Sequence, residues 1–256
     1  FEIIVCDVHS TDNTKEVVMS FLDKLAIKYI KQIKGRKGRA QACNTALGLA
    51  EGKIVIFTDD DWLFPKNCLE KHLNIHRAFK KKIVVIGRVF RLSSYLTKKI
   101  DEKKIIDGIF EDYISKTARS KDIIEEKKEF SFIFDRRGKV RRGIMRPELA
   151  FNPNSSVPLC KIVEVGYFDE KFVEWGQEDT ELGFRLYHQA HLDFIYNKDL
   201  KIYHLDHGNF GKEMSIRKFK GWVKNINYYF CKLLAYYYRR KNIRKEIKYS
   251  IEKIAF

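Results

Sequence analysis

The sequence has few cysteines, and their arrangement excludes two common small scaffolds. Five cysteines are spread over 256 residues, odd in number, widely spaced and without a C-x-x-C pair. A disulfide framework and a zinc ribbon both need paired, closely spaced cysteines, so neither fits this chain. Unpaired cysteines are typical of a reducing compartment, and we expect the protein to be cytoplasmic.

Long hydrophobic runs are also missing. A membrane-spanning helix needs about 18 or more predominantly apolar residues, and the best candidate, Tyr228 to Tyr238, is interrupted by Lys232. We therefore expect no transmembrane span. Because 45% of the residues are hydrophobic, the chain can still bury a sizeable core, as one large domain or as a domain with a helical appendage.

Negative charge is scarce relative to positive charge. Fifty Lys and Arg against 34 Asp and Glu give a formal net charge of +16, which favours an anionic partner such as phosphates, nucleic acid or acidic lipid. Segment 212–253 alone holds thirteen Lys and Arg against three Glu. Its basic residues are mixed with aromatic ones, which predicts helices that either pack on the core or lie on anionic lipid. We favour packing for the first helix and leave membrane contact open for the second.

Strand-like and helix-like runs alternate through the first third of the chain. The predicted strands are Glu2–Cys6, Ile27–Ile33, Ile54–Thr58 and Ile83–Val89, and the predicted helices are Thr14–Leu25, Arg39–Ala50 and Lys66–Lys80. This alternation predicts an α/β fold with a doubly wound, mostly parallel sheet flanked by helices. Because Phe1 opens directly into a strand without a preceding Met, we expect the natural chain to begin earlier, with a first strand that is missing here.

Charge-rich sequence interrupts this pattern between residues 91 and 148. The segment predicts helices over Thr97–Tyr113 and Ala118–Lys128, followed by a basic loop from Arg136 to Gly143. We interpret it as an insertion. It serves either as a flap over a bound substrate or a pyrophosphate, or as a solvent-exposed excursion, and the sequence favours neither alternative.

Three consecutive carboxylates, Asp59, Asp60 and Asp61, directly follow an apolar strand. Like charges at the end of a buried strand repel one another, so a bound cation would stabilise them, and oxygen ligands favour hard ions such as Mg²⁺ or Mn²⁺. The alternative is a polar loop that caps a helix starting near Pro65. In doubly wound sheets, ligands bind beyond the carboxyl ends of the strands, where Asp7 also falls.

A second acidic cluster follows Trp175 and Gly176. Glu178 and Asp179 stand at the start of a predicted helix, where the macrodipole stabilises negative charge and keeps a carboxylate ionised as a base. The simpler alternative is helix capping, for which acidic residues are also common.

Two histidines, His204 and His207, end a strand-like run that begins at Ile202. A single histidine in such a place is usually structural. Because this chain has a predicted divalent-cation site and two histidines at this strand end, a metal-ligand role for one of them is as well supported as a structural role.

Taken in order, these segments resemble the family 2 glycosyltransferases of the GT-A fold, in particular the subgroup whose carboxyl half is similar to β-galactosyltransferases and bacterial chondroitin-type polymerases. The similarity covers most of residues 1–210, interpreted as the glycosyltransferase domain, with 211–256 as basic C-terminal helices. The run from Val5 to Asp12 resembles the family's V-D-D-G-S-x-D loop. By position Asp7 is implied to contact the nucleotide base, although Val8 and His9 replace the family's second Asp and its Gly.

The next segments resemble the rest of the family's donor site. Residues 38–47 match its G-x-x-x-A-x-N helix, which implies that Arg39 approaches the uridine or the diphosphate. The acid triplet matches the D-x-D signature. The resemblance implies Asp59 at the ribose or the metal and Asp61 at the metal, and Asp60 could share either role.

The carboxyl-half match is the most specific, because it combines Asn154-Ser155-Ser156 with the run from Val165 to Glu170 and the Trp-Gly-Gln-Glu-Asp segment. It implies that Trp175, Gly176 and Glu178 bind the acceptor sugar.

It further implies that Asp179 is the catalytic base, assisted by Glu178. His204 falls where the subgroup places its imidazole metal ligand, with His207 as a substitute candidate.

The resemblance therefore implies an inverting, metal-dependent hexosyl- or N-acetylhexosaminyltransferase of polysaccharide biosynthesis that uses Mn²⁺ or Mg²⁺. Its donor would be a nucleotide-diphosphate sugar, favoured as a UDP-sugar, and its acceptor a hydroxyl of a glycan or glycoconjugate. Nucleic acid is not an expected partner. Two alternatives stay open: a noncatalytic relative that only binds a nucleotide sugar or glycan, suggested by Val8 and His9, and a basic nucleic-acid-binding protein, which explains the tail but not the acids.

Overall fold

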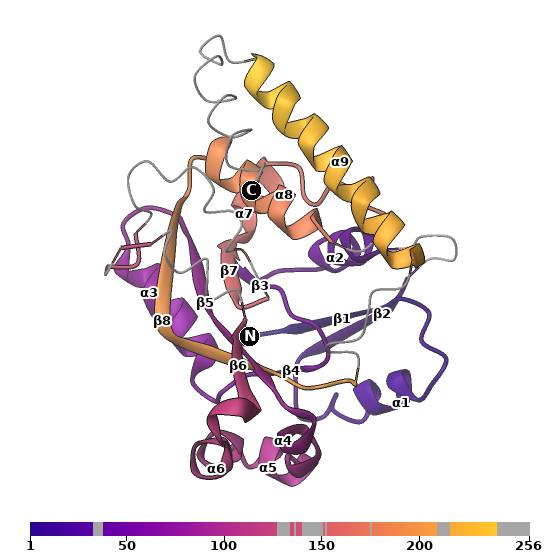
Figure 1. The fold of residues 1–256 in the computed structure, drawn as a ribbon, viewed down its shortest axis with the longest axis vertical. Helices are drawn as coiled ribbons and strands as arrows, with labels where there is room; N and C mark the ends of the chain where they lie inside the picture. Colours follow the sequence, from indigo (N-terminus) through magenta and orange to yellow (C-terminus); the bar gives the residue numbers. More distant parts are fainter. Residues whose placement is uncertain are drawn as a thin grey trace.

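The computed structural model describes residues 1–32, 38–126, 134–135, 137–139, 151, 153–174, 176–208 and 216–239. They form a two-stranded and a six-stranded β-sheet with helices around them (Figure 1). The predicted α/β class is confirmed.

The smaller sheet pairs β1 (Ile3–Asp7) with β2 (Ile27–Lys31) in parallel. Helix α1 (Thr14–Met19) lies between them in sequence, and α2 (Arg39–Leu47) packs against β1; both end earlier than predicted. Among the described strands, β1 has only β2 as a hydrogen-bonded neighbour. The Glu2 carboxylate accepts hydrogen bonds from the backbone N–H groups of Glu51 and Gly52, at 2.8 Å each. These two residues follow α2 in the sequence.

The larger sheet has the strand order β3-β7-β5-β8-β4, with β6 beside β5. Its strands are β3 (Ile54–Ile56), β4 (Trp62–Leu63), β5 (Ile83–Leu92), β6 (Ile123–Glu126), β7 (Ser155–Pro158) and β8 (Asp193–His204). The two longest strands, β5 and β8, run parallel, whereas the short strands β3, β4, β6 and β7 pair antiparallel. The antiparallel pairing was not predicted, because it joins segments far apart in the sequence.

The main core lies between this sheet and three helices: α7 (Leu159–Glu164), α8 (Glu178–His188) and α9 (Ile216–Arg239). On the other side, α3 (Cys68–Ala78) packs against β5 and β8. Tyr229 and Leu233 of α9 are buried in the main core, which confirms the predicted packing of the first C-terminal helix. Residues 240–256, predicted as the second, lie outside the described residues. No helix in the described part of the chain is long and apolar enough to cross a bilayer.

The first predicted helix of the insertion, Thr97–Tyr113, is instead three short helices. They are α4 (Ser94–Lys99), α5 (Glu102–Ile106) and α6 (Phe110–Thr117), which lie together at one end of the molecule (Figure 1). Asp101 caps α5 through the N–H of Lys104 at 2.9 Å, and Gly108 has a φ of +65°, which ends the helical run.

The second predicted helix, Ala118–Lys128, is wrong for its described residues. A 3₁₀ turn, η1 (Ser120–Asp122), leads into β6, which pairs with the end of β5 so that Ile123 lies opposite Leu92. The β-branched Ile123 and Ile124 favour this strand, and its pairing with β5 overrides helix propensity. Of the basic loop, only residues 137–139 are described.

Candidate active site

The acid triplet lies where β3 gives way to β4. Asp61 immediately precedes β4, and β4 pairs antiparallel with the end of β8, which places Trp62 opposite His204. The Asp61 carbonyl also accepts a hydrogen bond from the N–H of Leu205 at 2.9 Å. Strand pairing therefore brings the acid triplet to the histidines, although about 140 residues separate them.

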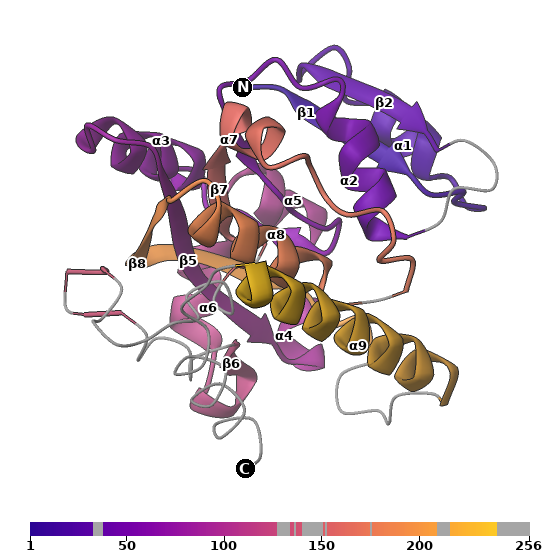
Figure 2. The same cartoon turned by 90° about the horizontal axis from the view of Figure 1, so that it is seen from above.

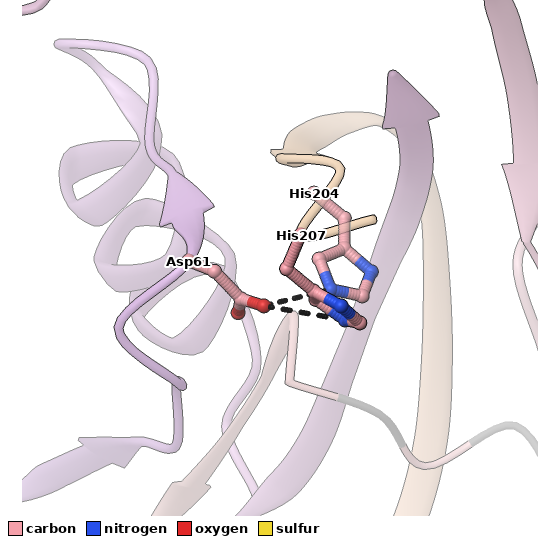
Figure 3. Close-up of side chains that lie close together, drawn as sticks. All are labelled: Asp61, His204 and His207. Carbon is pink, nitrogen blue, oxygen red and sulfur yellow. Dashed lines mark hydrogen bonds and ion pairs between the residues drawn. The ribbon is translucent and has the colours of Figure 1, made fainter. Parts of the chain in front are cut away.

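Asp61, His204 and His207 point toward one another (Figure 3). The Oδ2 atom of Asp61 lies 3.1 Å from Nε2 of His204 and 3.9 Å from Nε2 of His207. The Trp62 ring stacks on the His204 imidazole, with centroids 4.3 Å apart and planes 14° apart, and so fixes the ring's plane. Each of the three residues offers one ligand atom, and these atoms all lie within 4.8 Å of one another.

A second carboxylate contacts His204 from the other side. Glu126, on β6, accepts a hydrogen bond through Oε1 from Nδ1 of His204 at 3.0 Å and from Nε of Arg91 at 2.8 Å. Burial opposes the charged imidazole, but the hydrogen bonds to Asp61 and Glu126 outweigh it and raise the pKa of His204 to about 9. Glu126 was missed from the sequence, because its segment was predicted as a helix.

The chemistry of this donor set fits a divalent transition ion. One carboxylate oxygen and two imidazole nitrogens converge there, and mixed N,O ligands suit such ions better than Mg²⁺, which prefers oxygen alone. The hydrogen bond from Nδ1–H of His204 to Glu126 is also suitable, since it keeps the proton on Nδ1 and leaves Nε2 facing Asp61. Of the predicted metal ligands, Asp61 and His204 belong to this cluster, together with the substitute candidate His207.

Arg39, the first residue of α2, lies between the two acidic clusters. Its Nε is 3.3 Å from Oδ1 of Asp59, and its Nη1 is 3.6 Å from Oε1 of Glu178. The same helix carries Asn44, whose side chain accepts from the N–H of Phe168 at 2.9 Å and donates to its carbonyl at 3.0 Å. Helix α2 thus connects the acid triplet to the carboxyl half of the site.

Glu178 is the most buried acid of the predicted site, with 4% of its surface exposed. Burial, and then the charge of Asp179, raise the pKa of its carboxyl group. Its Oε2 atom is buried and has no hydrogen-bond partner among the described residues. Such an atom usually needs a partner, so this oxygen is suited to accept a hydrogen bond from a bound ligand.

Asp179 is half-buried beside it, at the start of α8. Its Oδ1 accepts a hydrogen bond from the N–H of Thr180 at 2.7 Å. The two residues before Glu178, Gly176 and Gln177, have φ angles of +92° and +75°. This turn is described except for Trp175, which lies outside the described residues, so its predicted role stays a prediction.

Asp7 ends β1 and is buried. Its Oδ2 accepts from the Tyr29 hydroxyl at 2.6 Å and its Oδ1 from the N–H of Ser10 at 2.7 Å, and these bonds lower the pKa of Asp7 to about 2. The carboxylate is therefore fixed and ionised at the carboxyl end of its strand. His9 has a φ of +63°, at the position where the resembling family has glycine.

Two predicted donor-site residues, Asp59 and Asp60, lie outside the cluster of Asp61, His204 and His207. Asp59 contacts Arg39 and is not in the three-ligand cluster, and Asp60 is exposed. Their predicted roles at the ribose, nucleotide or metal stay predictions.

Comparison with known proteins identifies the family of this chain. The family model described as "Glycosyl transferase family 2" matches residues 1–143, more than half of the sequence. The chain therefore belongs to glycosyltransferase family 2.

The chain is also similar in sequence to three curated proteins. The chain is 32% identical over 81% of its length to "Uncharacterized glycosyltransferase YfnE" of Bacillus subtilis, covering 57% of that protein. It is 29% identical over 73% of its length to "Validoxylamine A glucosyltransferase" of Streptomyces hygroscopicus, covering 44%, and 25% identical over 94% to "Chondroitin synthase" of Escherichia coli, covering 35%. The chain thus spans a third to about half of these relatives.

Solved structures support the GT-A fold. The TM-score is 0.58 against S. aureus TarS 1–349 in complex with UDP, at 17% identity, covering 90% of this chain and 63% of that one. It is 0.55 against the mannosyltransferase PcManGT from Pyrobaculum calidifontis in complex with GDP-Man and Mn²⁺, also at 17% identity, covering 91% and 55%.

Proposed function

We propose that this protein is an inverting, metal-dependent glycosyltransferase that moves a hexosyl or N-acetylhexosaminyl group from a nucleotide-diphosphate sugar to a hydroxyl of a glycan or glycoconjugate. The convergence of Asp61, His204 and His207 at the D-x-D segment carries the proposal. A cation site placed there is suited to a ligand with phosphates, and structural neighbours were solved with UDP and with GDP-Man and Mn²⁺. We favour a UDP-sugar donor.

Each side of the site has a distinct task in this proposal. A divalent cation held by Asp61, His204 and His207 would stabilise the negative charge that develops on the leaving diphosphate. Arg39 adds positive charge on the same side, and it already lies between Asp59 and Glu178. Asp7 is proposed to hold the nucleotide base.

The acceptor hydroxyl is proposed to bind at the start of α8. Oε2 of Glu178, which has no hydrogen-bond partner among the described residues, accepts a hydrogen bond from the acceptor sugar, and Trp175 and Gly176 are proposed to bind the same sugar. Asp179 removes the proton of the attacking hydroxyl while the bond to the anomeric carbon forms. A single displacement, with the diphosphate leaving from the opposite face, inverts the anomeric configuration.

The first test is hydrolysis of a panel of UDP- and GDP-sugars, with and without Mn²⁺, followed by transfer to simple glycosides. We expect hydrolysis of at least one donor that stops when the cation is chelated. Binding of a donor without any turnover would favour the noncatalytic alternative, and neither binding nor turnover would favour the nucleic-acid alternative.

The second test separates the base from donor binding. Replacing Asp179 by Asn removes the proton acceptor with little change in shape, so transfer should fall by about 10²- to 10⁴-fold. Donor affinity, measured by calorimetry with the intact nucleotide sugar, should stay within about twofold of the wild type, because Asp179 does not touch the donor in this proposal. A parallel loss of both would show that Asp179 is not the base.

The surroundings of the reaction are proposals as well. We propose a role in polysaccharide biosynthesis at the cytoplasmic face of a membrane, with peripheral contact through the basic segment 211–256, whose net charge suits acidic lipid. Flotation with vesicles of phosphatidylcholine alone and with added phosphatidylglycerol tests it. Equal recovery on both kinds of vesicle would contradict an electrostatic contact.

A further inference from the structure

Helix α9 is hydrogen-bonded to the turn that precedes Glu178. Asn225 is 1% exposed, and its side-chain amide nitrogen donates to the carbonyl of Glu174 at 3.0 Å and to that of Gly176 at 2.8 Å. Asparagine is unfavourable in a helix interior and costly to bury without partners. The two bonds to one turn therefore account for this residue better than helix propensity does.

Helix α9 also contacts Asp169, at the beginning of the segment 169–176 that leads into this turn. The Tyr228 hydroxyl and the Lys232 ammonium group each donate to Oδ2 of Asp169 at 2.8 Å, and Lys232 also pairs with the buried Glu181 of α8. Helix α9 lies beside α8 in both views (Figures 1 and 2). It thus holds segment 169–176 at its beginning and at its end.

The conformation of the turn explains why it needs such support. Gly176 and Gln177 both have positive φ angles. A positive φ is unfavourable for glutamine, so contacts with the surrounding structure must stabilise the turn in this conformation. A Cβ at Gly176 would lie 3.1 Å from Cδ1 of Trp222 on α9, so helix and turn are in close contact. The bond from Asn225 to the Gly176 carbonyl orients the peptide group that joins Gly176 to Gln177.

We propose that Asn225 is a positioning residue for the acceptor side of the site. It acts through the 174–176 turn on the placement of Glu178 and Asp179 and does not itself touch substrate. Naming this side the acceptor side rests on the proposed function, whereas the hold of α9 on the turn does not.

The chain offers a matched pair of variants for the test. Asn225→Asp keeps the size of the side chain and removes both hydrogen-bond donors. Asn227→Asp makes the same chemical change on the exposed face of the same helix. Amide hydrogen exchange over residues 174–180 should become at least about tenfold faster in Asn225→Asp and stay at the wild-type rate in Asn227→Asp. Equal exchange of this segment in the two variants would overturn the proposal.

The same pair gives a readout that general loss of stability does not move. With a UDP-sugar that the wild type hydrolyses and p-nitrophenyl glycosides as acceptors, the ratio of transfer to hydrolysis should fall at least about tenfold in Asn225→Asp, since small misplacements are costly. The KM for the donor should not change. An unchanged ratio would overturn the proposal.

Failure of the proposed function and failure of the role proposed for Asn225 give different results in these experiments. If the wild type hydrolyses no donor, the proposed function fails, and the exchange experiment still decides whether Asn225 holds the turn. If Asn225→Asp does not fold, Asn225→Ser, which keeps one shorter donor, replaces it with the same expected direction in both measurements, and wild-type exchange over 174–180 would then overturn the proposal.

Discussion

The histidine pair His204 and His207 differs from the pair His72 and His76 in the charge of its neighbours. Carboxylates face the first pair: Asp61 lies near both rings, and a second one contacts His204 from behind. Hydroxyl and amide groups face the second pair, which lies on α3. Sequence spacing is similar, three residues in one case and four in the other.

The second pair forms a neutral network. Nδ1 of His72 is 2.8 Å from Oγ of Ser156, and Nε2 of the same ring is 2.9 Å from Oδ1 of Asn154. Nε2 of His76 is 2.8 Å from the same hydroxyl. Burial, and then the neighbouring His72, lower the pKa of His76 to about 4, and burial also lowers the pKa of His72.

The difference shows that burial alone does not set the role of a histidine. Burial lowers the pKa of His72 and His76 and also opposes the charged form of His204, but carboxylates reverse the outcome at His204. The carboxylate that faces His204 and His207 also attracts a metal ion, which would replace the Nε2 proton of His204, so this cluster can hold a metal. The second pair joins α3 to β7.

The largest expected effect separates the two pairs by metal binding. Replacing His204 by Ala should lower Mn²⁺ affinity by at least about 100-fold, because a direct ligand is lost. His76→Ala should leave it within about twofold of the wild type, since the hydrogen-bond partner of that ring among the described residues is a hydroxyl and not a carboxylate. Electron paramagnetic resonance of free Mn²⁺ measures both. Wild-type affinity in His204→Ala would remove the basis of the comparison.

A smaller loss is expected from the carboxylate behind the ligand. Glu126→Gln should lower Mn²⁺ affinity by about 10- to 100-fold, because the amide holds His204 less firmly and without charge. Glu125→Gln is the control on the same strand, since its carboxylate pairs with Arg88 instead. If both variants bind Mn²⁺ equally well, Glu126 does not support the site.

The neutral pair should contribute to stability and not to metal binding. Ser156→Ala leaves the Nδ1 atom of His72 and the Nε2 atom of His76 without their hydroxyl partner, which should lower the free energy of unfolding by about 1–3 kcal/mol. Ser115→Ala, at an exposed position on α6, should change it by less than about 0.5 kcal/mol. Urea denaturation compares them; an equal, small change in both would show that the network is dispensable.

The smallest expected effect is an opposite pH response in the metal-free protein. The His76 pKa is lowered from 6.5, so the unfolded chain takes up the proton first, and stability is lost as pH falls from 6.5 toward about 4. The His204 pKa is raised, so its contribution is complete below 6.5 and is lost as pH rises toward about 9. Urea midpoints across this range should show that His76→Gln flattens the acidic side and His204→Gln the alkaline side. The same change on both sides would contradict the assignment.

The sequence predicted the parts of the site that depend on local pattern. The acid triplet after an apolar strand and the histidines at the end of another could be read directly, and the resemblance placed Asp61 and His204 together. Glu126 and Asn225 could not be found in this way. Glu126 depends on the pairing of β6 with β5 more than thirty residues away, and Asn225 depends on where α9 packs.

The small sheet has a consequence for how the protein opens. Strand β1 has no hydrogen-bonded neighbour besides β2 among the described strands, and the two carry mostly half-buried side chains, whereas most side chains of β5 are buried. Elements with fewer buried contacts unfold locally at lower free energy than the core. The region around Asp7 should therefore fluctuate as a separate cooperative unit while the strands bearing Asp61 and His204 stay protected. Under the proposed function, nucleotide binding would cost the ordering of this small sheet against the more rigid larger sheet.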